Sequence, residues 1–397
     1  MPFIGNKPTA IPLSADDLED NIISTAKIQD NAVTAAKYIE PIPFRNIIIN
    51  GDMSIAQRGT SATSIDSTND GYLTMDRWIH VQQADDSNTG KTSMTQSTTV
   101  PSGQGFANSL KIDCTTAQTS ISGTNSRVVV TQRFEGQNLQ YLKKGTSSAE
   151  SLTASFWVKS NKTGTYICAL RDRDNSRDIA KSYTISSADT WEKKTITFEG
   201  DTTGAFDNDN ARSLDVIWGL AAGSDYSSGT LQTTWGTANN ANVLVGQVNL
   251  MDSTSNEWYI TGVQLEAGTA ASDFEFLPYD VNLQRCYRYY QMIIRNIDNS
   301  GMGMGFYSAS NNARFVYFPK VTLRTIPSLD QSTASNSFRV FSAGGADDLI
   351  TSWNIMDSAR PNFVISNNTA DASGTAGQAG YVLTNTASSY FALNAEL

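Results

Sequence analysis

Short runs of apolar and β-branched residues, each closed by Gly, Asn or Ser, recur from residue 44 to about residue 279. Residues 152–159 alternate in polarity, residues 161–164 carry the turn sequence Asn-Lys-Thr-Gly, and residues 165–170 form a second run. Two runs joined in this way are typical of a β-hairpin. Further runs lie at 127–135, 181–185, 191–199, 214–220, 243–249 and 258–265. Many short strands without a strong helix between them predict an antiparallel β-sandwich, which we assign to residues 45–280.

The C-terminal part of the chain is expected to form a second, smaller β domain. Residues 281–294 predict a helix, because Leu283, Cys286, Tyr287 and Tyr290 would fall on one of its faces. Strand patterns then return at 313–319, 321–325, 337–342, 362–366 and 381–383, whereas the glycines of 301–305 predict a flexible turn. Residues 281–397 are therefore assigned to a linking helix followed by this domain.

Residues 1–44 differ from the rest of the chain. The segment Asp20–Ile28 recurs ten residues later as Asp30–Tyr38, with the shared pattern Asp-Asn, two apolar residues, two small residues, Ala-Lys and an apolar residue. A repeat this short buries no core of its own, so it gains order by packing against copies of itself or a partner. An extended or helical attachment segment is favoured over a floppy tail, and Pro41 and Pro43 mark its end.

Charge and composition exclude several classes of function. The 397 residues carry 29 Lys and Arg against 39 Asp and Glu, a net charge of −10, which argues against nucleic-acid partners. No run approaches the ~18 apolar residues of a membrane helix, and the N-terminus lacks a secretory signal pattern, so we expect no membrane insertion. Three cysteines without a CxxC pair predict neither a disulfide framework nor a zinc site, and we expect all three to be small buried hydrophobes.

Two aromatic residues are candidates for glycan binding. Trp235 and Tyr226 lie in the polar loop 221–242, which has no apolar periodicity around them. Flat rings in such loops stack on sugar faces while neighbouring polar groups bind hydroxyls. The alternative is that they simply close the loop. Trp157, Trp191 and Trp258 begin or lie within predicted strands and are expected to fill the sandwich core instead.

A group of carboxylates is the candidate metal site. Asp172, Asp174 and Asp178 supply oxygens at nearly alternate positions, as the start of a calcium loop does, but the mid-loop Gly and closing Glu are missing. Three arginines are interleaved with these carboxylates, which favours a solvated ion-pair loop over Ca²⁺. Residues 207–210 are a similar but weaker candidate. Otherwise no cofactor is expected.

The sequence offers no catalytic constellation. Its single histidine, His80, excludes mechanisms that need two imidazoles and is itself expected to face solvent or a backbone carbonyl. No G-x-S-x-G elbow and no phosphate-binding glycine motif is present. A glycosidase needs only two carboxylates, and 39 acidic residues do not exclude such a pair. We expect a non-catalytic protein, with a polysaccharide hydrolase as the alternative.

Several motifs resemble a family of bacteriophage tail-fibre and related virion proteins, common in marine phages. Residues 46–59, with the pattern N-x-x-I-N-G-D-M-x-x-x-Q-R-G, are followed by Asp76-Arg77-Trp78 and then by the strand motif S-F-W-V-K within 152–159. Further pieces in the family's order lie at 132–136, 191–192, 200–204, 258–268, 274–279 and 286–291. The resemblance covers residues 45–291 and is specific because order and spacing both agree.

The resemblance implies a jelly-roll domain akin to carbohydrate-binding modules, in a homo-oligomer that is most often a trimer. Phe3, Ile4, Gly5 and Asn6, with the decapeptide repeat, would attach the chain to other tail or virion proteins. The C-terminal domain would be distal and meet host cell-surface polysaccharide. The expected location is the tail of the virion, in a fibre, and the alternative is a capsid decoration or head fibre.

Overall fold

The computed structural model describes residues 44–83, 90–121, 125–342, 347–357, 362–367 and 372–397. The predicted attachment segment, including Phe3, Ile4, Gly5, Asn6 and the decapeptide repeat, lies outside the described residues apart from Phe44. Residues Phe44–Leu397 form one compact unit. No helix among the described residues is long and apolar enough to cross a bilayer.

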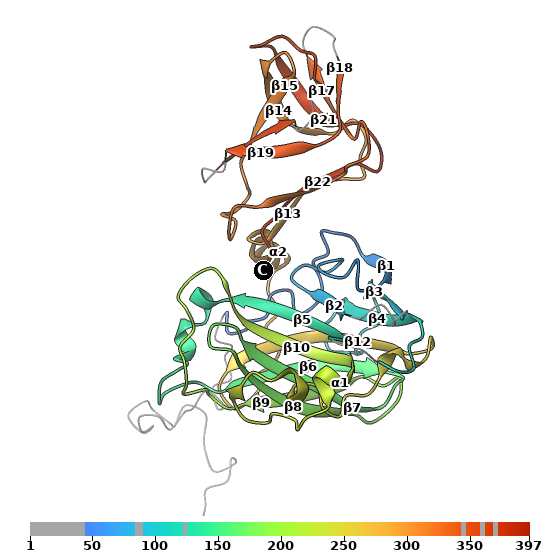
Figure 1. The fold of residues 1–397 in the computed structure, drawn as a ribbon, viewed down its shortest axis with the longest axis vertical. Helices are drawn as coiled ribbons and strands as arrows, with labels where there is room; N and C mark the ends of the chain where they lie inside the picture. The colour runs from blue at the N-terminus through green and yellow to red at the C-terminus, as the bar shows by residue number, and fades with distance from the viewer. Residues whose placement is uncertain (1–43, 84–89, 122–124, 343–346, 358–361, 368–371) are drawn as a thin grey trace, which may run out of the picture. The chain divides into compact units, whose positions relative to one another are not determined.

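Two six-stranded antiparallel sheets form the predicted jelly-roll β-sandwich (Figure 1). The first sheet has the order β1 (Ser61–Ile65), β3 (Lys91–Ser97), β4 (Ser109–Thr116), β12 (Glu257–Ala267), β6 (Leu152–Ser160), β9 (Glu192–Phe198). The second sheet has the order β11 (Gly236–Thr237), β8 (Arg177–Ile185), β7 (Gly164–Asp172), β10 (Arg212–Ala222), β5 (Arg127–Glu135), β2 (Ile79–Gln83). The expected all-β class is confirmed.

Large aromatic side chains fill the space between the two sheets. The ring centre of Trp218 lies 5.5 Å from that of Trp78 and 5.9 Å from that of Phe156. Trp258 is also fully buried there, as expected. The same prediction was wrong for Trp157 and Trp191, which are only partly buried and do not belong to the core cluster. Rings of this size bury enough apolar area to dominate the core energetics of a sandwich.

The C-terminal residues form the predicted second group of strands. A three-stranded sheet has the order β13 (Tyr290–Arg295), β22 (Tyr390–Asn394), β16 (Ser328–Gln331). A seven-stranded sheet has the order β18 (Asp347–Ile350), β17 (Phe338–Ser342), β21 (Ala379–Thr384), β14 (Gly301–Ala309), β15 (Asn312–Tyr317), β20 (Phe363–Asn367), β19 (Trp353–Asp357). Phe315, Phe338, Trp353 and Phe391 pack against one another in the core of this part. The domain limits near residues 44 and 280 stay predictions.

Short helices connect the strands. Two are α-helical, α1 (Ser224–Ser227) and α2 (Tyr279–Tyr287). Four described 3-10 turns are η4 (Gly136–Asn138), η5 (Gln140–Leu142), η6 (Asn240–Asn242) and η7 (Leu250–Asp252).

The structure corrects five local predictions. The hairpin expected from residues 152–170 does not form, because β6 pairs with β9 and β12 in the first sheet whereas β7 pairs with β8 and β10 in the second. The helix expected over 281–294 ends at Tyr287, because residues from Tyr290 onward pair with β22. The glycine-rich residues 301–305 lie in strand β14 rather than in a turn. A Cβ at Gly305 would lie 2.5 Å from the carbonyl oxygen of Arg314, so glycine permits close strand approach there. No strand covers 243–249 or 321–325.

His80 is also placed differently from the prediction. It is fully buried, and its Nε2 lies 3.1 Å from the hydroxyl of Thr92. His80 pairs across the second sheet with Val130, whose side chain belongs to the sandwich core. Alternation along β2 therefore directs the imidazole inward.

Residues of the first two motifs, 46–59 and 76–78, meet in one hydrogen-bonded junction. Asn50 has a left-handed backbone (φ 60°), and its side-chain amide donates to the carbonyls of Ile55 and Asp76 at 2.9 and 3.0 Å. The indole of Trp78 donates to the carbonyl of Asn50 at 2.9 Å. Gln57 extends the junction, since its side chain binds the backbone of β13. The motif thus has a structural explanation.

A candidate ligand groove on the second sheet

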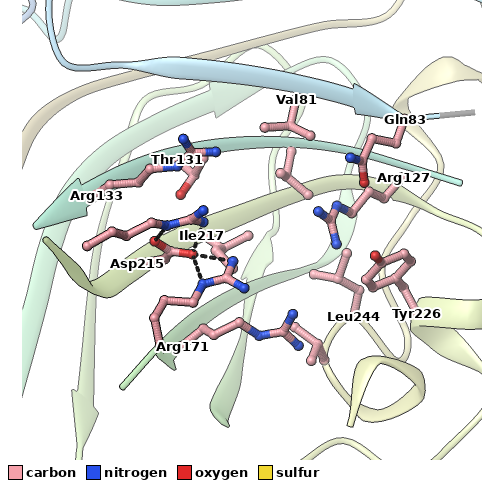
Figure 2. Close-up of a pocket in the computed structure, with 14 residues that line it drawn as sticks. Val81, Gln83, Arg127, Thr131, Arg133, Arg171, Asp215, Ile217, Tyr226 and Leu244 are labelled. Carbon is pink, nitrogen blue, oxygen red and sulfur yellow. Dashed lines mark hydrogen bonds and ion pairs between the residues drawn. The ribbon is translucent and has the colours of Figure 1, made fainter. Parts of the chain in front are cut away.

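A groove of about 220 Å³ lies on the face of the second sheet that points away from the sandwich core (Figure 2). Alternate residues of β5 face opposite ways: Val128 and Val130 enter the core, whereas Val129, Thr131 and Arg133 line the groove. Arg127 of β5 also lines the groove. Other strands and loops supply Val81, Gln83, Arg171, Arg173, Arg212, Asp215, Ile217, Tyr226, Val243 and Leu244.

Strand register sorts the lining into a charged row and an apolar row. Asp215 on β10 pairs with Arg133 on β5 and with Arg171 on β7. Two residues further along β10, Ile217 pairs with Thr131 and Ala169. The groove therefore has an apolar and hydroxyl-bearing floor beside a row of charges.

Three of the five arginines in the lining share two buried carboxylates. Arg171 donates to Asp178 from Nε at 2.6 Å and from Nη2 at 2.8 Å. Arg173 and Arg212 both bind the carboxylate of Asp215, with Nε–oxygen distances of 2.7 and 2.6 Å. Asp215 and Asp178 are almost completely buried, so their charges are neutralised by these contacts.

The remaining two arginines form no ion pair with an Asp or Glu side chain among the described residues. The guanidinium carbon of Arg127 lies 4.4 Å from the ring centre of Tyr226, and Arg133 donates to the main-chain oxygen of Leu397. The buried Nε atoms of both lack a hydrogen-bond partner in the part of the chain that the structure describes. Burial, and then repulsion by a neighbouring arginine, lowers the pKa of Arg127 and Arg133 below the ordinary value.

The two predicted glycan-contact residues are not brought together. Tyr226 lies in α1 and lines the groove, with Arg127 stacked on its ring. Trp235 lies outside the lining: its indole donates to the carbonyl of Glu199 at 2.7 Å, and its ring packs against the sandwich core. Contact of Tyr226 and Trp235 with a sugar stays a prediction, and the placement of Trp235 fits the alternative of loop closure.

The candidate calcium carboxylates are bound by groups of the protein itself. Asp172 accepts hydrogen bonds from the amides of Asp174 and Asn175 and pairs with Lys144 at 2.6 Å. Asp174 accepts from the amide of Asp207, and Asp178 is held by Arg171. The described residues contain no group of three His, Cys, Asp or Glu that could hold a metal ion. These contacts fit the ion-pair alternative, although Asp172 and Asp178 are buried rather than solvated.

The arginine groove itself was not identified from sequence. Its charges come from β5, from β10 and from the end of β7 with the turn that follows it, and only the sheet order brings these distant segments together. A partial signal exists in β5, where Arg127, Thr131 and Arg133 recur at even spacing beside the core-facing valines.

No family model and no curated protein matches the chain. Solved structures that match include carbohydrate-binding modules, a putative sugar binding protein and a phage tailspike domain. The enzymatically active domain of tailspike protein 4 of bacteriophage CBA120 is 12% identical, with a TM-score of 0.29; the match covers 57% of this chain and 22% of the tailspike chain. A putative sugar binding protein from Bacteroides thetaiotaomicron is 13% identical, with a TM-score of 0.30 and coverage of 56% and 99%.

The C-terminal family 22 carbohydrate binding module of Clostridium thermocellum Xyn10B is 9% identical, with a TM-score of 0.30 and coverage of 58% and 100%. At TM-scores of this size these likenesses assign no ligand and no activity to the chain.

Proposed function

We propose that the chain is a non-catalytic glycan-binding protein of a phage tail fibre, and that the groove on the second sheet is its glycan site. The observation that carries this proposal is the composition of the groove. Val129, Ile217 and Leu244 offer apolar surface, while hydroxyl, amide and guanidinium groups surround it. Saccharides present apolar C–H faces and hydroxyl edges, which such a combination binds.

The absence of catalysis is part of the proposal and has support from the lining. Asp215 is the carboxylate that the described lining supplies, and it is held by both Arg173 and Arg212. Glycoside hydrolysis requires a pair of carboxyl groups, about 5–9.5 Å apart, of which one can donate a proton. Among the described residues, the groove lining supplies one carboxylate, Asp215, rather than such a pair.

The assignment to a tail fibre is supported by the sequence motifs of residues 45–291. We propose that the predicted attachment segment binds other virion proteins, and that the chain works as a homotrimer. Several weak sugar sites on one particle bind host polysaccharide more tightly than one site does, because the second contact is intramolecular.

Calorimetric titration with host surface polysaccharide tests the glycan site. Ile217→Trp fills the groove floor, and we expect it to weaken binding at least 10-fold without lowering the midpoint of thermal unfolding. Thr184→Trp is the matched control, since Thr184 is exposed on β8 of the same sheet and outside the groove. Equal binding by wild type and Ile217→Trp would contradict the assignment of the groove.

Two further measurements test the rest of the proposal. Release of new reducing ends from the polysaccharide would contradict the proposed absence of catalysis and would show that the chain is a virion-borne hydrolase. Labelling of the chain in electron micrographs of the particle distinguishes a tail fibre from a capsid decoration or head fibre. The mass of the chain in solution tests the trimer.

A further inference from the structure

We propose that the glycan bound in this groove is acidic: a polysaccharide whose units carry carboxylate or sulfate groups, held by Arg127 and Arg133. This inference rests on the proposed glycan site and specifies its ligand. The groove gathers five arginines in a chain whose net charge is −10, so the positive charge is local to this face.

Ion pairing inside the protein accounts for only part of this charge. Arg171, Arg173 and Arg212 together use Asp178 and Asp215. A further carboxylate, Asp70, interacts electrostatically with Arg127 and Arg133, and it accepts a hydrogen bond from the backbone amide of Gln82 at 2.9 Å. Among the described residues, even with Asp70 included, five guanidinium groups face three side-chain carboxylates, and Arg127 and Arg133 are the two without an Asp or Glu ion pair.

The unpaired groups are also partly removed from water. The Nε atoms of Arg127 and Arg133 are buried without a hydrogen-bond partner among the described residues. A buried donor on a charged group is costly unless an acceptor is supplied. An oxyanion of a ligand supplies both the missing acceptor and the opposite charge, and guanidinium groups bind carboxylate and sulfate in a two-pronged geometry.

The spacing of the two arginines favours a polymer over a small free anion. Arg127 and Arg133 lie six residues apart on the same face of β5, which separates their backbones by roughly 20 Å. Val129 and Thr131 occupy the intervening positions of that face. A saccharide chain with charges at intervals can reach both arginines while its uncharged faces contact the floor between them.

The packing of Arg127 fits a binding role. Its guanidinium stacks on Tyr226, whose ring is itself buried beside Val243 and Leu244 (Figure 2). Stacking of this kind restricts the guanidinium to a plane, so less freedom is lost when a ligand binds to its edge.

Binding to matched acidic and neutral polysaccharides tests the inference. The probes are dextran sulfate against dextran, and polygalacturonate against its methyl ester, at 0.15 M salt. We expect the acidic member of at least one pair to bind wild type at least 10-fold more tightly, with an affinity that falls as salt rises. A difference confined to the dextran pair would show that the groove prefers sulfate groups, and a difference confined to the polygalacturonate pair would show that it prefers carboxylate groups.

Substitutions then locate the acidic contact. We expect Arg127→Gln and Arg133→Gln each to weaken acidic binding 5- to 50-fold, and Arg127→Lys to weaken it less because charge remains. Lys193→Gln removes one exposed charge from β9 of the other sheet and should leave binding unchanged. Because Arg133→Gln also removes the hydrogen bond to Leu397, thermal unfolding is measured for every variant. The acidic probe should raise the unfolding midpoint of wild type but not of the Arg127→Gln/Arg133→Gln double variant.

The outcomes separate this inference from the proposed function. Equal binding of acidic and neutral probes, or arginine variants that bind like wild type, would overturn the acidic ligand and leave the glycan site standing. Failure of every saccharide, including host polysaccharide, to bind would overturn both. Polyglutamate or single-stranded DNA binding as tightly as the acidic saccharides would show a general polyanion surface and would contradict the choice of a saccharide.

Discussion

Arg288 donates two hydrogen bonds to the carboxylate of Glu135, from Nε at 2.8 Å and from Nη2 at 2.6 Å. The hydroxyl of Tyr289 donates to the same carboxylate at 2.5 Å. Glu135 ends β5 of the sandwich, whereas Arg288 follows α2 and leads into β13. The contact therefore joins the sandwich to the segment that begins the C-terminal strands.

Removal of Arg288 should destabilise the protein strongly. The side chain of Glu135 is 0% exposed, so Arg288→Ala leaves a buried carboxylate without its cationic partner. We expect a loss of about 3 kcal/mol in the free energy of unfolding at pH 7, measured in urea. Arg288→Lys should recover part of it, because Lys keeps the charge but not the two-pronged contact. An Arg288→Ala variant as stable as wild type would show that the contact contributes nothing.

The same contact should weaken in acid. Burial by itself would raise the pKa of Glu135, but the hydrogen bonds from Arg288 and Tyr289 outweigh it and lower the pKa below its ordinary value of 4.5. Stability from this group is therefore complete above pH 4.5 and is lost as the pH falls below it. Unfolding measured between pH 5 and 3 should show a smaller loss for Glu135→Gln than for wild type.

Two buried groups, His80 and Asp76, should change the free energy of unfolding in opposite directions between pH 6.5 and 4.5. Burial lowers the pKa of His80 from 6.5 to about 4, so the unfolded chain gains a proton first and stability falls as the pH falls. Burial raises the pKa of Asp76 from 3.8 to about 6, partly countered by Arg58, so the folded chain gains a proton first and stability rises.

Single variants separate these two effects. In His80→Gln the Asp76 contribution remains, and we expect the free energy of unfolding to rise by up to about 2 kcal/mol between pH 6 and 4.5. In Asp76→Asn it should fall by a similar amount over the same interval, while wild type changes little. His80 is the only histidine, so its imidazole proton resonance gives its pKa directly. Titration of that resonance near pH 6.5 would refute the His80 assignment.

Local sequence patterns were sufficient to predict the strands β6 and β7 and the extent of β5, because alternation of side chains is a property of neighbouring residues. The predicted pairing of β6 with β7 was wrong, because the two strands belong to different sheets. The end of α2 was not predictable in this way. Residues 290–294 carry a helical pattern but form a strand, since they pair with residues about 100 positions later in β22. Long-range pairing overrides local preference there.

The candidate groove shows the same limit. Tyr226 was identified because an aromatic residue in a polar loop is unusual within its own neighbourhood. The sequence did not connect Arg133 and Arg171 with Tyr226. These two arginines lie on β5 and β7, and they become neighbours only because Asp215, on the strand β10 between them, pairs with both. The ion-pair alternative for the candidate calcium loop was also only partly predictable. The sequence showed the nearby arginines, but not that Lys144 would reach Asp172.

Gly51 of the N-G-D motif should tolerate no side chain. A Cβ at this position would lie 2.1 Å from the carbonyl oxygen of Val263, and the carbonyl of Gly51 accepts a hydrogen bond from the amide of Val263 at 2.9 Å. The two backbones are therefore held at a separation that only glycine permits. We expect Gly51→Ala to lower the free energy of unfolding by about 3 kcal/mol.

Gly301→Ala is the matched control, because a Cβ at Gly301 in β14 meets nothing within 4 Å. Its effect should stay within about 0.5 kcal/mol. If Gly51→Ala unfolds at the same denaturant concentration as Gly301→Ala, the motif glycine is not required by this close approach. Then the junction of Asn50, Gln57 and Trp78 would have to be explained by hydrogen bonding alone.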